Sequence, residues 1–125
     1  MEEKPTILVA EDEETNFLLL EIWLKKFCHL LRAHDGNQAV SIAKENPNLD
    51  LILMDIKMPY LNGIEATRAI RKTNQNIPII AQTAFMHKEL NEILEAGSNE
   101  VISKPIRREK FTKLLTKYLP HLKFV

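Results

Sequence analysis

The sequence has little cysteine, no surplus of charge of either sign and no long apolar run, and each shortage excludes a class of protein. Its single cysteine, Cys28, cannot form an internal disulfide, which argues against a small disulfide-stabilised secreted domain. With 17 basic and 17 acidic residues, the chain lacks the basic surplus of proteins that bind the nucleic-acid backbone. Neither a leader peptide nor a membrane-spanning run is recognisable. We therefore expect a cytoplasmic domain with no membrane insertion and no direct contact with nucleic acid.

The length and the apolar content fit one domain. A chain of 125 residues lies near the commonest domain size, and 45% apolar residues are ample for one hydrophobic core. Internal repeats, low-complexity segments and linker-like stretches are not found in the sequence. We expect residues 1–125 to form a single domain.

Short apolar runs alternate along the chain with segments whose apolar residues recur at helical spacing. The strands expected from these runs are residues 7–10, 30–33, 49–54, 77–81 and 101–102. Helices that cross over between such apolar strands make the sheet parallel and cover both of its faces. The sequence therefore predicts an α/β fold of five βα units, a doubly wound three-layer sandwich around a five-stranded parallel sheet.

Polar side chains stand where four of these strands end. They are Glu11 and Asp12 after the first strand, Asp55 after the third, Thr83 after the fourth and Lys104 after the fifth. Open parallel sheets bind ligands at the carboxyl ends of their strands, so we expect these side chains to converge. Two carboxylates about 4 Å apart repel by roughly 4 kcal/mol at an effective dielectric near 20, so the cluster raises a pKa or holds a cation. Oxygen ligands of this kind suit Mg²⁺.

Each of these residues also has an ordinary structural interpretation. Glu11 and Asp12 could favour a helix N-terminus, and Thr83 could cap the following helix. Lys104 could be a surface charge. Their joint placement at four strand ends is much harder to obtain by chance. A zinc site is not expected, because metal-ligand spacing is absent among the four histidines, His29, His34, His87 and His121.

Two classes of protein with this architecture fit the sequence poorly. A flavodoxin-like cofactor binder needs glycines and hydroxyls in its first loop to hold a phosphate, whereas this loop reads AEDEETN. A phosphatase of the haloacid dehalogenase type needs a second Asp two residues after its nucleophile. Lys57 stands at that position, so a turnover enzyme is disfavoured.

The chain strongly resembles the response-regulator receiver family over nearly its whole length. The motifs that carry the resemblance are ILVAEDEETN, LDLILMDIKMPYLNGIEATRAIR, IPIIAQTA and EAGSNEVISKPI, and they are most similar to receivers of hybrid histidine kinases. The resemblance implies a flavodoxin-like fold with the sheet order 2-1-3-4-5 of the chemotaxis receiver. It also implies a two-component phosphorelay domain that signals by a conformational switch and is not an enzyme acting on other substrates.

The resemblance also assigns the site residues and the partners. Asp55 would accept a phosphoryl group from a histidine kinase or a histidine phosphotransfer domain, with Lys104 pairing with that group and Thr83 donating a hydrogen bond to it. The Mg²⁺ ligands would be three carboxylates and one backbone carbonyl, those of Glu11, Asp12, Asp55 and Lys57. A cis bond between Lys104 and Pro105 and a phosphorylation-dependent homodimer are further expectations. A degenerate receiver that only binds partners remains the rival interpretation.

The sequence departs from the family at the position three residues before Lys104. Many receivers carry there an aromatic ring that turns inward when the threonine moves, and here the residue is Val101. A valine cannot report the switch by the same ring movement. Lys57 and Phe85 occupy the variable positions two residues after Asp55 and Thr83, where they would flank the path of an attacking water.

The first helix is expected to carry a partner surface. At about 100° per residue its main apolar stripe packs on the sheet, and three further apolar residues point away from that stripe. These are Leu18, Leu19 and Ile22. An apolar cluster rimmed by charge marks an interaction site, although single exposed apolar residues are common. By the resemblance, this helix docks against the helices that carry the phosphohistidine.

Overall fold

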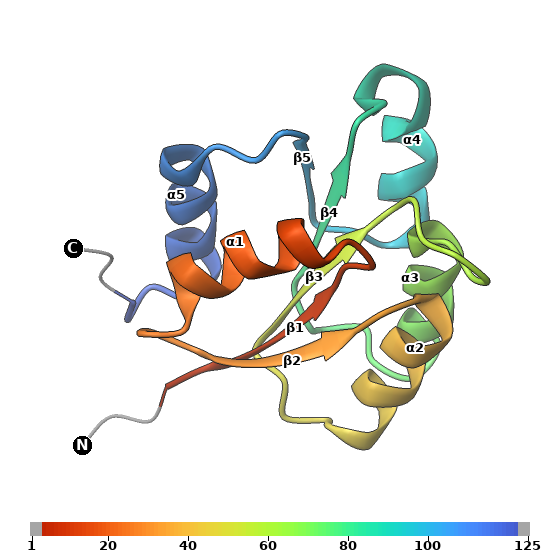
Figure 1. Ribbon diagram of the computed structural model, residues 1–125. Helices are drawn as coiled ribbons and strands as arrows, with labels where there is room; N and C mark the ends of the chain where they lie inside the picture. The colour runs from red at the N-terminus through yellow and green to blue at the C-terminus, as the bar shows by residue number, and fades with distance from the viewer. Residues whose placement is uncertain (1–3, 123–125) are drawn as a thin grey trace.

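Five parallel strands form the central layer of the computed structural model, which describes residues 4–122. In chain order they are β1 Thr6–Ala10, β2 His29–Ala33, β3 Leu51–Asp55, β4 Ile79–Thr83 and β5 Glu100–Ser103. Across the sheet they lie in the order β2-β1-β3-β4-β5, and every pairing is parallel (Figure 1). The predicted fold class and strand order are confirmed.

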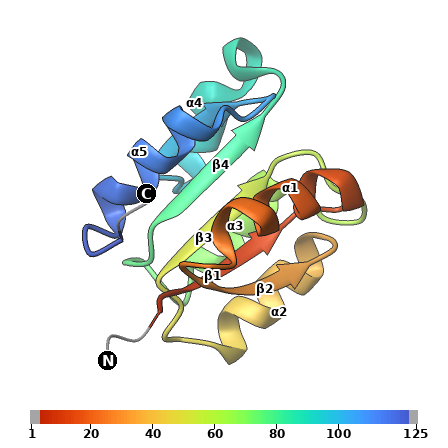
Figure 2. The same cartoon turned by 60° about the vertical axis from the view of Figure 1, so that its left-hand side comes forward.

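Five helices cover the two faces of this sheet. They are α1 Glu14–Leu24, α2 Gly36–Glu45, α3 Gly63–Arg71, α4 Met86–Ala96 and α5 Arg108–Tyr118. Helices α1 and α5 lie on one face, and α2, α3 and α4 lie on the other (Figures 1 and 2). Over residues 4–122, none of the helices has the length and apolar character needed to cross a membrane.

The strands are apolar on both sides because the sheet is covered on both sides. Successive strand residues point to opposite faces, so Ile7 and Val9 pack under α1 and α5 while Leu8 and Ala10 pack under α2 and α3. All five residues of β3 and all five of β4 are buried. The two central strands therefore have little freedom to shift, which fixes the position of the residues at their ends.

Each strand differs from the prediction by one or two residues at one or both ends, and the differences in β3 and β4 matter for the site. The fourth strand runs from Ile79 to Thr83 rather than over 77–81, and the third starts at Leu51 rather than at residue 49. Pro78 lacks an N–H group, and its carbonyl accepts a hydrogen bond from the Ile52 N–H just before β4 begins. Apolar residues in the sequence indicate which segments are buried. The hydrogen-bonded pairing of the strands extends further, into the polar residues that follow the apolar run. Asp55 and Thr83 are consequently the last paired residues of their strands, not the first residues of loops.

Helix α1 has the two sides that its apolar pattern predicts. Phe17, Leu20 and Leu24 are buried against the sheet. Three apolar side chains face outward with exposed fractions of 43%, 43% and 66%, those of Leu18, Leu19 and Ile22. At the margin, the ring of Trp23 packs on that of Phe111 of α5, with the ring centroids 5.9 Å apart.

Glycine is needed at two positions for different structural reasons. Gly97 ends α4 with φ 121, a left-handed conformation that favours glycine. Gly63 does not provide the left-handed turn of its loop, because the left-handed residue there is Tyr60, with φ 67. Gly63 is needed because the chain passes close to the end of β3. A Cβ at this position would lie 2.2 Å from the backbone oxygen of Asp55.

We expect Gly63→Ala to destabilise the protein although alanine is the better helix former. The clash is with backbone, so strand β3 or helix α3 must shift, at a cost of about 2 kcal/mol or more in the free energy of unfolding. Urea denaturation measures this loss. Ser41→Ala at an exposed position of α2 is the control and should stay within about 0.5 kcal/mol of the unmodified protein. A Gly63→Ala protein at least as stable as the unmodified one would show that the approach is not tight.

Candidate functional site

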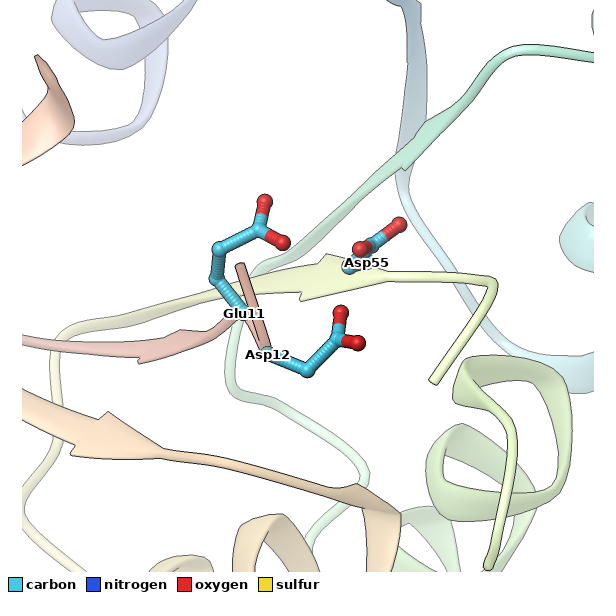
Figure 3. A group of neighbouring side chains, drawn as sticks. All are labelled: Glu11, Asp12 and Asp55. Carbon is cyan, nitrogen blue, oxygen red and sulfur yellow. The ribbon is translucent and has the colours of Figure 1, made fainter. Parts of the chain in front are cut away.

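Three carboxylates meet at the carboxyl edge of the sheet (Figure 3). Glu11 and Asp12 follow β1, and Asp55 ends the neighbouring strand β3. One oxygen of each can be chosen so that all three lie within 4.8 Å of one another. Glu11 and Asp55 are buried, with exposed fractions of 0% and 2%, whereas Asp12 is exposed. The structure thus brings together the three carboxylates that the sequence singled out.

The cluster holds more negative charge than its surroundings balance. Burial, and next the charge of Asp55, raise the pKa of Glu11 to about 7. Lys104 and the Glu13 N–H, which donates to Glu11 Oε2 at 3.2 Å, act in the opposite direction but do not cancel the shift. Near neutral pH, Glu11 is therefore divided between its charged and protonated forms.

Lys104 is the cation that the protein itself directs at this cluster. Its Nζ lies 2.9 Å from Asp55 Oδ1 and 3.8 Å from Glu11 Oε1. The peptide bond between Lys104 and Pro105 is cis, as expected. The Lys104 N–H donates to the carbonyl of Thr83 at 2.9 Å, which ties the end of β5 to the end of β4. The ammonium of Lys104 therefore points into the carboxylate cluster.

Thr83 is buried at the end of β4, close to the first turn of α4. Its hydroxyl donates a hydrogen bond to Glu89 Oε1 at 2.6 Å. The same oxygen accepts a hydrogen bond from the Phe85 N–H at 3.1 Å. Sequence reasoning missed Glu89, because nothing in the spacing of the motifs relates a residue in α4 to the hydroxyl of Thr83.

An open cleft of about 740 Å³ gives access to these groups. Its lining includes seven polar or aromatic residues that matter here: Asp12, Asp55, Lys57, Thr83, Phe85, Glu89 and Lys104. At its rim, the ammonium of Lys57 lies 5.8 Å from the centre of the Phe85 ring. The two variable positions noted in the sequence therefore face each other across the entrance to Asp55.

The arrangement of oxygen atoms fits a hard divalent cation. Asp55 Oδ1 is buried and accepts no hydrogen bond within residues 4–122, and the Lys104 ammonium lies in ion-pair contact with it at 2.9 Å. Three carboxylates this close together are costly unless enough positive charge balances them, and Lys104 supplies only one such charge. Glu11, Asp12 and Asp55 could hold such an ion. The predicted contribution of the Lys57 carbonyl stays a prediction.

Arg32 of β2 fixes the loop that carries the acidic pair. Its Nε and Nη2 donate to the backbone oxygen of Glu11 at 3.2 and 3.1 Å. Its Nη1 pairs with Glu14 Oε2 at 2.6 Å, and its guanidinium lies 4.5 Å from the centre of the Phe17 ring. The site prediction did not include Arg32, because a single arginine in an edge strand carries no sequence signal. It restrains the backbone of the acidic pair itself and also holds the side chain of Glu14, two residues further on.

We expect Arg32→Ala to weaken Mg²⁺ binding by about tenfold, because groups that orient metal ligands typically contribute that much to affinity. Arg32→Lys should recover only part of the loss, since an ammonium cannot form the forked contact. Isothermal titration with Mg²⁺ measures the effect. The control is Arg68→Ala, which removes an arginine from an exposed ion pair on α3. Equal affinities for Arg32→Ala and the unmodified protein would mean that the loop keeps its shape without the arginine.

Comparison with known proteins identifies the family. Residues 7–116 match the family model of the response regulator receiver domain. The chain belongs to this family. It is 43% identical over 110 residues to the hybrid signal transduction histidine kinase I of Dictyostelium discoideum, a match that covers 80% of this chain and 6% of the relative. The predicted similarity to receivers of hybrid histidine kinases is therefore confirmed.

Two solved structures share the fold closely. The receiver domain of the sensor histidine kinase PA1611 from Pseudomonas aeruginosa has a magnesium ion coordinated in its active-site cleft. It aligns with a TM-score of 0.86 at 34% identity over 94% of this chain and 99% of that one. The Saccharomyces cerevisiae Ssk1 receiver, crystallised with the histidine phosphotransfer protein Ypd1, aligns with a TM-score of 0.85 at 30% identity over 92% and 88%. Other relatives are much longer than this chain. The chain spans 16% and 18% of the transcription factor SKN7 of Chaetomium thermophilum and of Saccharomyces cerevisiae, and 14% of the sensor kinase/phosphatase LuxQ of Vibrio vulnificus.

Proposed function

We propose that this receiver domain takes a phosphoryl group onto Asp55 from a histidine kinase or a histidine phosphotransfer domain, in a reaction that requires Mg²⁺. One observation carries the proposal: a buried carboxylate without a hydrogen-bond partner on Oδ1 lies in an open cleft beside two other carboxylates and an ammonium. The related PA1611 receiver, which has magnesium in its cleft, supports the choice of metal. The Ssk1 receiver, crystallised with Ypd1, supports the choice of partner.

The proposed metal ligands are the three carboxylates and the carbonyl of Lys57. Bound there, Mg²⁺ would supply positive charge against the oxygens of the transferring group. The carboxylates of Glu11 and Asp12 repel an anionic donor when the cluster carries no cation. Their role in the proposal is to hold the cation and thereby make the approach of a phosphoryl group possible.

In the transfer itself, a carboxylate oxygen of Asp55 forms a bond to phosphorus as the bond between phosphorus and the donor imidazole breaks. Lys104 Nζ, 2.9 Å from Asp55 Oδ1, is placed to pair with the phosphoryl oxygens once Asp55 has become an acyl phosphate. Thr83 donates a hydrogen bond to the same group. The domain acts on its own side chain, so we class it as a signalling phosphoacceptor that catalyses only its own phosphorylation and dephosphorylation.

We expect a small phosphodonor and Mg²⁺ to add one phosphoryl group to the protein and none to Asp55→Asn. An amide is a far weaker nucleophile than a carboxylate, and it does not complete the charge of the metal site. Intact-mass spectrometry measures the adduct. Asp50→Asn, a substitution at an exposed aspartate just before β3, is the control and should be labelled normally.

Chelation of Mg²⁺ should abolish the adduct in the unmodified protein. Equal labelling of Asp55→Asn would contradict the assignment of the acceptor. If the unmodified protein takes up no phosphoryl group and titration detects no Mg²⁺ binding, the rival interpretation of a degenerate receiver that only binds partners replaces this proposal.

The proposed partner surface is the outer side of α1, formed by Leu18, Leu19 and Ile22. A groove of about 470 Å³ runs beside it, between α1 and the loop that leads into α5. Leu19 and Trp23 line one wall of the groove, and Lys104 and Ile106 line the other. Apolar area thus adjoins the ammonium that contacts Asp55, which suits a partner that brings a phosphohistidine to the cleft. A phosphorylation-dependent homodimer and a cytoplasmic location also belong to the proposal.

We expect Leu19→Glu and Ile22→Glu to slow transfer from the cognate phosphodonor protein by about tenfold, equivalent to ~1.4 kcal/mol, while labelling by a small donor stays unchanged. The reason is that a charge replaces apolar area that the complex would bury. Rapid-quench transfer assays measure the rate. Asn37→Glu, at an exposed position of α2, adds the same charge elsewhere and serves as the control. Wild-type rates in both α1 variants would place the contact surface elsewhere, with the face of α4 and α5 as the next candidate.

A further inference from the structure

The hydroxyl of Thr83 is already engaged in this structure. It donates its one proton to Glu89 Oε1 at 2.6 Å, and its oxygen accepts from the Phe85 N–H at 3.1 Å. Glu89 lies in the first turn of α4, is partly buried and lines the same cleft as Asp55. The contact therefore joins the end of β4 to the start of α4 inside the site.

A hydroxyl has a single hydrogen, so it cannot donate to Glu89 and to a phosphoryl group at once. Hydrogen bonds to a carboxylate are short and stronger than neutral ones, so the bond to Glu89 is a real competitor. The contact between Thr83 and Glu89 is therefore incompatible with a hydrogen bond from Thr83 to a phosphoryl group. Binding of the phosphoryl group by Thr83 requires that Glu89 release the proton.

We propose that Glu89 is a positioning residue that withholds the Thr83 hydroxyl from the phosphoryl group until phosphorylation breaks the contact, and that this release frees the first turn of α4. The inference rests on the proposed function of Asp55. It goes further by naming the side chain that opposes the phosphorylated state and the helix that its release affects.

The start of α4 is well placed to respond. Phe85, the residue before the helix, gives it no side-chain cap. The hydrogen bond from Thr83 to Glu89 ties the first turn of the helix to the end of β4. Val101 packs beside Ile93 and Ala96 on the inner side of the same helix and has no ring to move. The contact with Glu89 links Thr83 to α4 directly, so this link does not need the aromatic ring that is missing at Val101.

The test uses beryllofluoride with Mg²⁺ as a stable stand-in for the aspartyl phosphate. We expect Glu89→Ala to bind it about tenfold more tightly than the unmodified protein, because Thr83 no longer has to leave a charged acceptor. Glu89→Gln keeps a neutral acceptor and should give an intermediate gain. Glu92→Ala removes the same charge from an exposed position of the same helix and should leave the affinity unchanged. Fluorine NMR measures the bound fraction.

A Thr83→Ala background separates the hydroxyl from simple charge repulsion. If Glu89 acts through the hydroxyl, adding Glu89→Ala to Thr83→Ala should not tighten binding further. A gain that persists in this background would show that Glu89 acts by its charge alone and would overturn the proposal.

The amide of Phe85 gives a second readout that does not depend on affinity. Its N–H donates to Thr83 Oγ1, so rotation of the hydroxyl changes its environment. In Glu89→Ala without beryllofluoride, the Phe85 amide resonance should move toward its position in the beryllofluoride-bound protein. An unmoved resonance together with an unchanged or weaker affinity contradicts the proposal. If the unmodified protein itself binds no beryllofluoride, the proposed function fails first, and the role of Glu89 fails with it.

Discussion

The constraint on which the site depends is the burial of Glu11 beside a second buried carboxylate, that of Asp55, at the edge of the sheet. Burial first, and then the charge of Asp55, raise the pKa of Glu11 to about 7 although Lys104 acts in the opposite direction, so Glu11 is not fully ionised at neutral pH. Lys104, with its Nζ 2.9 Å from Asp55 Oδ1, supplies one positive charge against these carboxylates. The negative charge that Lys104 does not balance makes the cluster suited to a cation. A cation bound there would let an anionic donor approach.

The fold places these charges together through the order of its strands. Strands β1 and β3 are neighbours in the sheet, so the residues at their carboxyl ends must meet, and β4 and β5 bring Thr83 and Lys104 to the same edge. The fully buried central strands resist a change of register that would separate the carboxylates. The packing that stabilises the sheet therefore also holds the carboxylates close together.

Much of this could be predicted from the sequence, because it follows from periodicity and from what stands at the end of each strand. The apolar runs give the strands, and the polar residues after them give Glu11, Asp12, Asp55, Thr83 and Lys104. Other features could not be predicted. Arg32 and Glu89 act through single side-chain contacts that no spacing encodes, and Gly63 is required by a backbone approach that only coordinates reveal. The predicted start of β4 lies two residues before the observed one, because apolar residues indicate burial and not hydrogen-bonded strand pairing.

The most direct test of the account is a carbon NMR titration of the Glu11 carboxyl group, with and without Mg²⁺. Without a divalent cation, the account predicts that Glu11 titrates with a pKa near 7, since burial and the neighbouring Asp55 disfavour its charge. Saturating Mg²⁺ should lower this pKa clearly, because the cation favours the ionised form. A Glu11 pKa near its ordinary 4.5 in the absence of metal, or one that Mg²⁺ does not move, would contradict the claim that unbalanced buried charge defines the site.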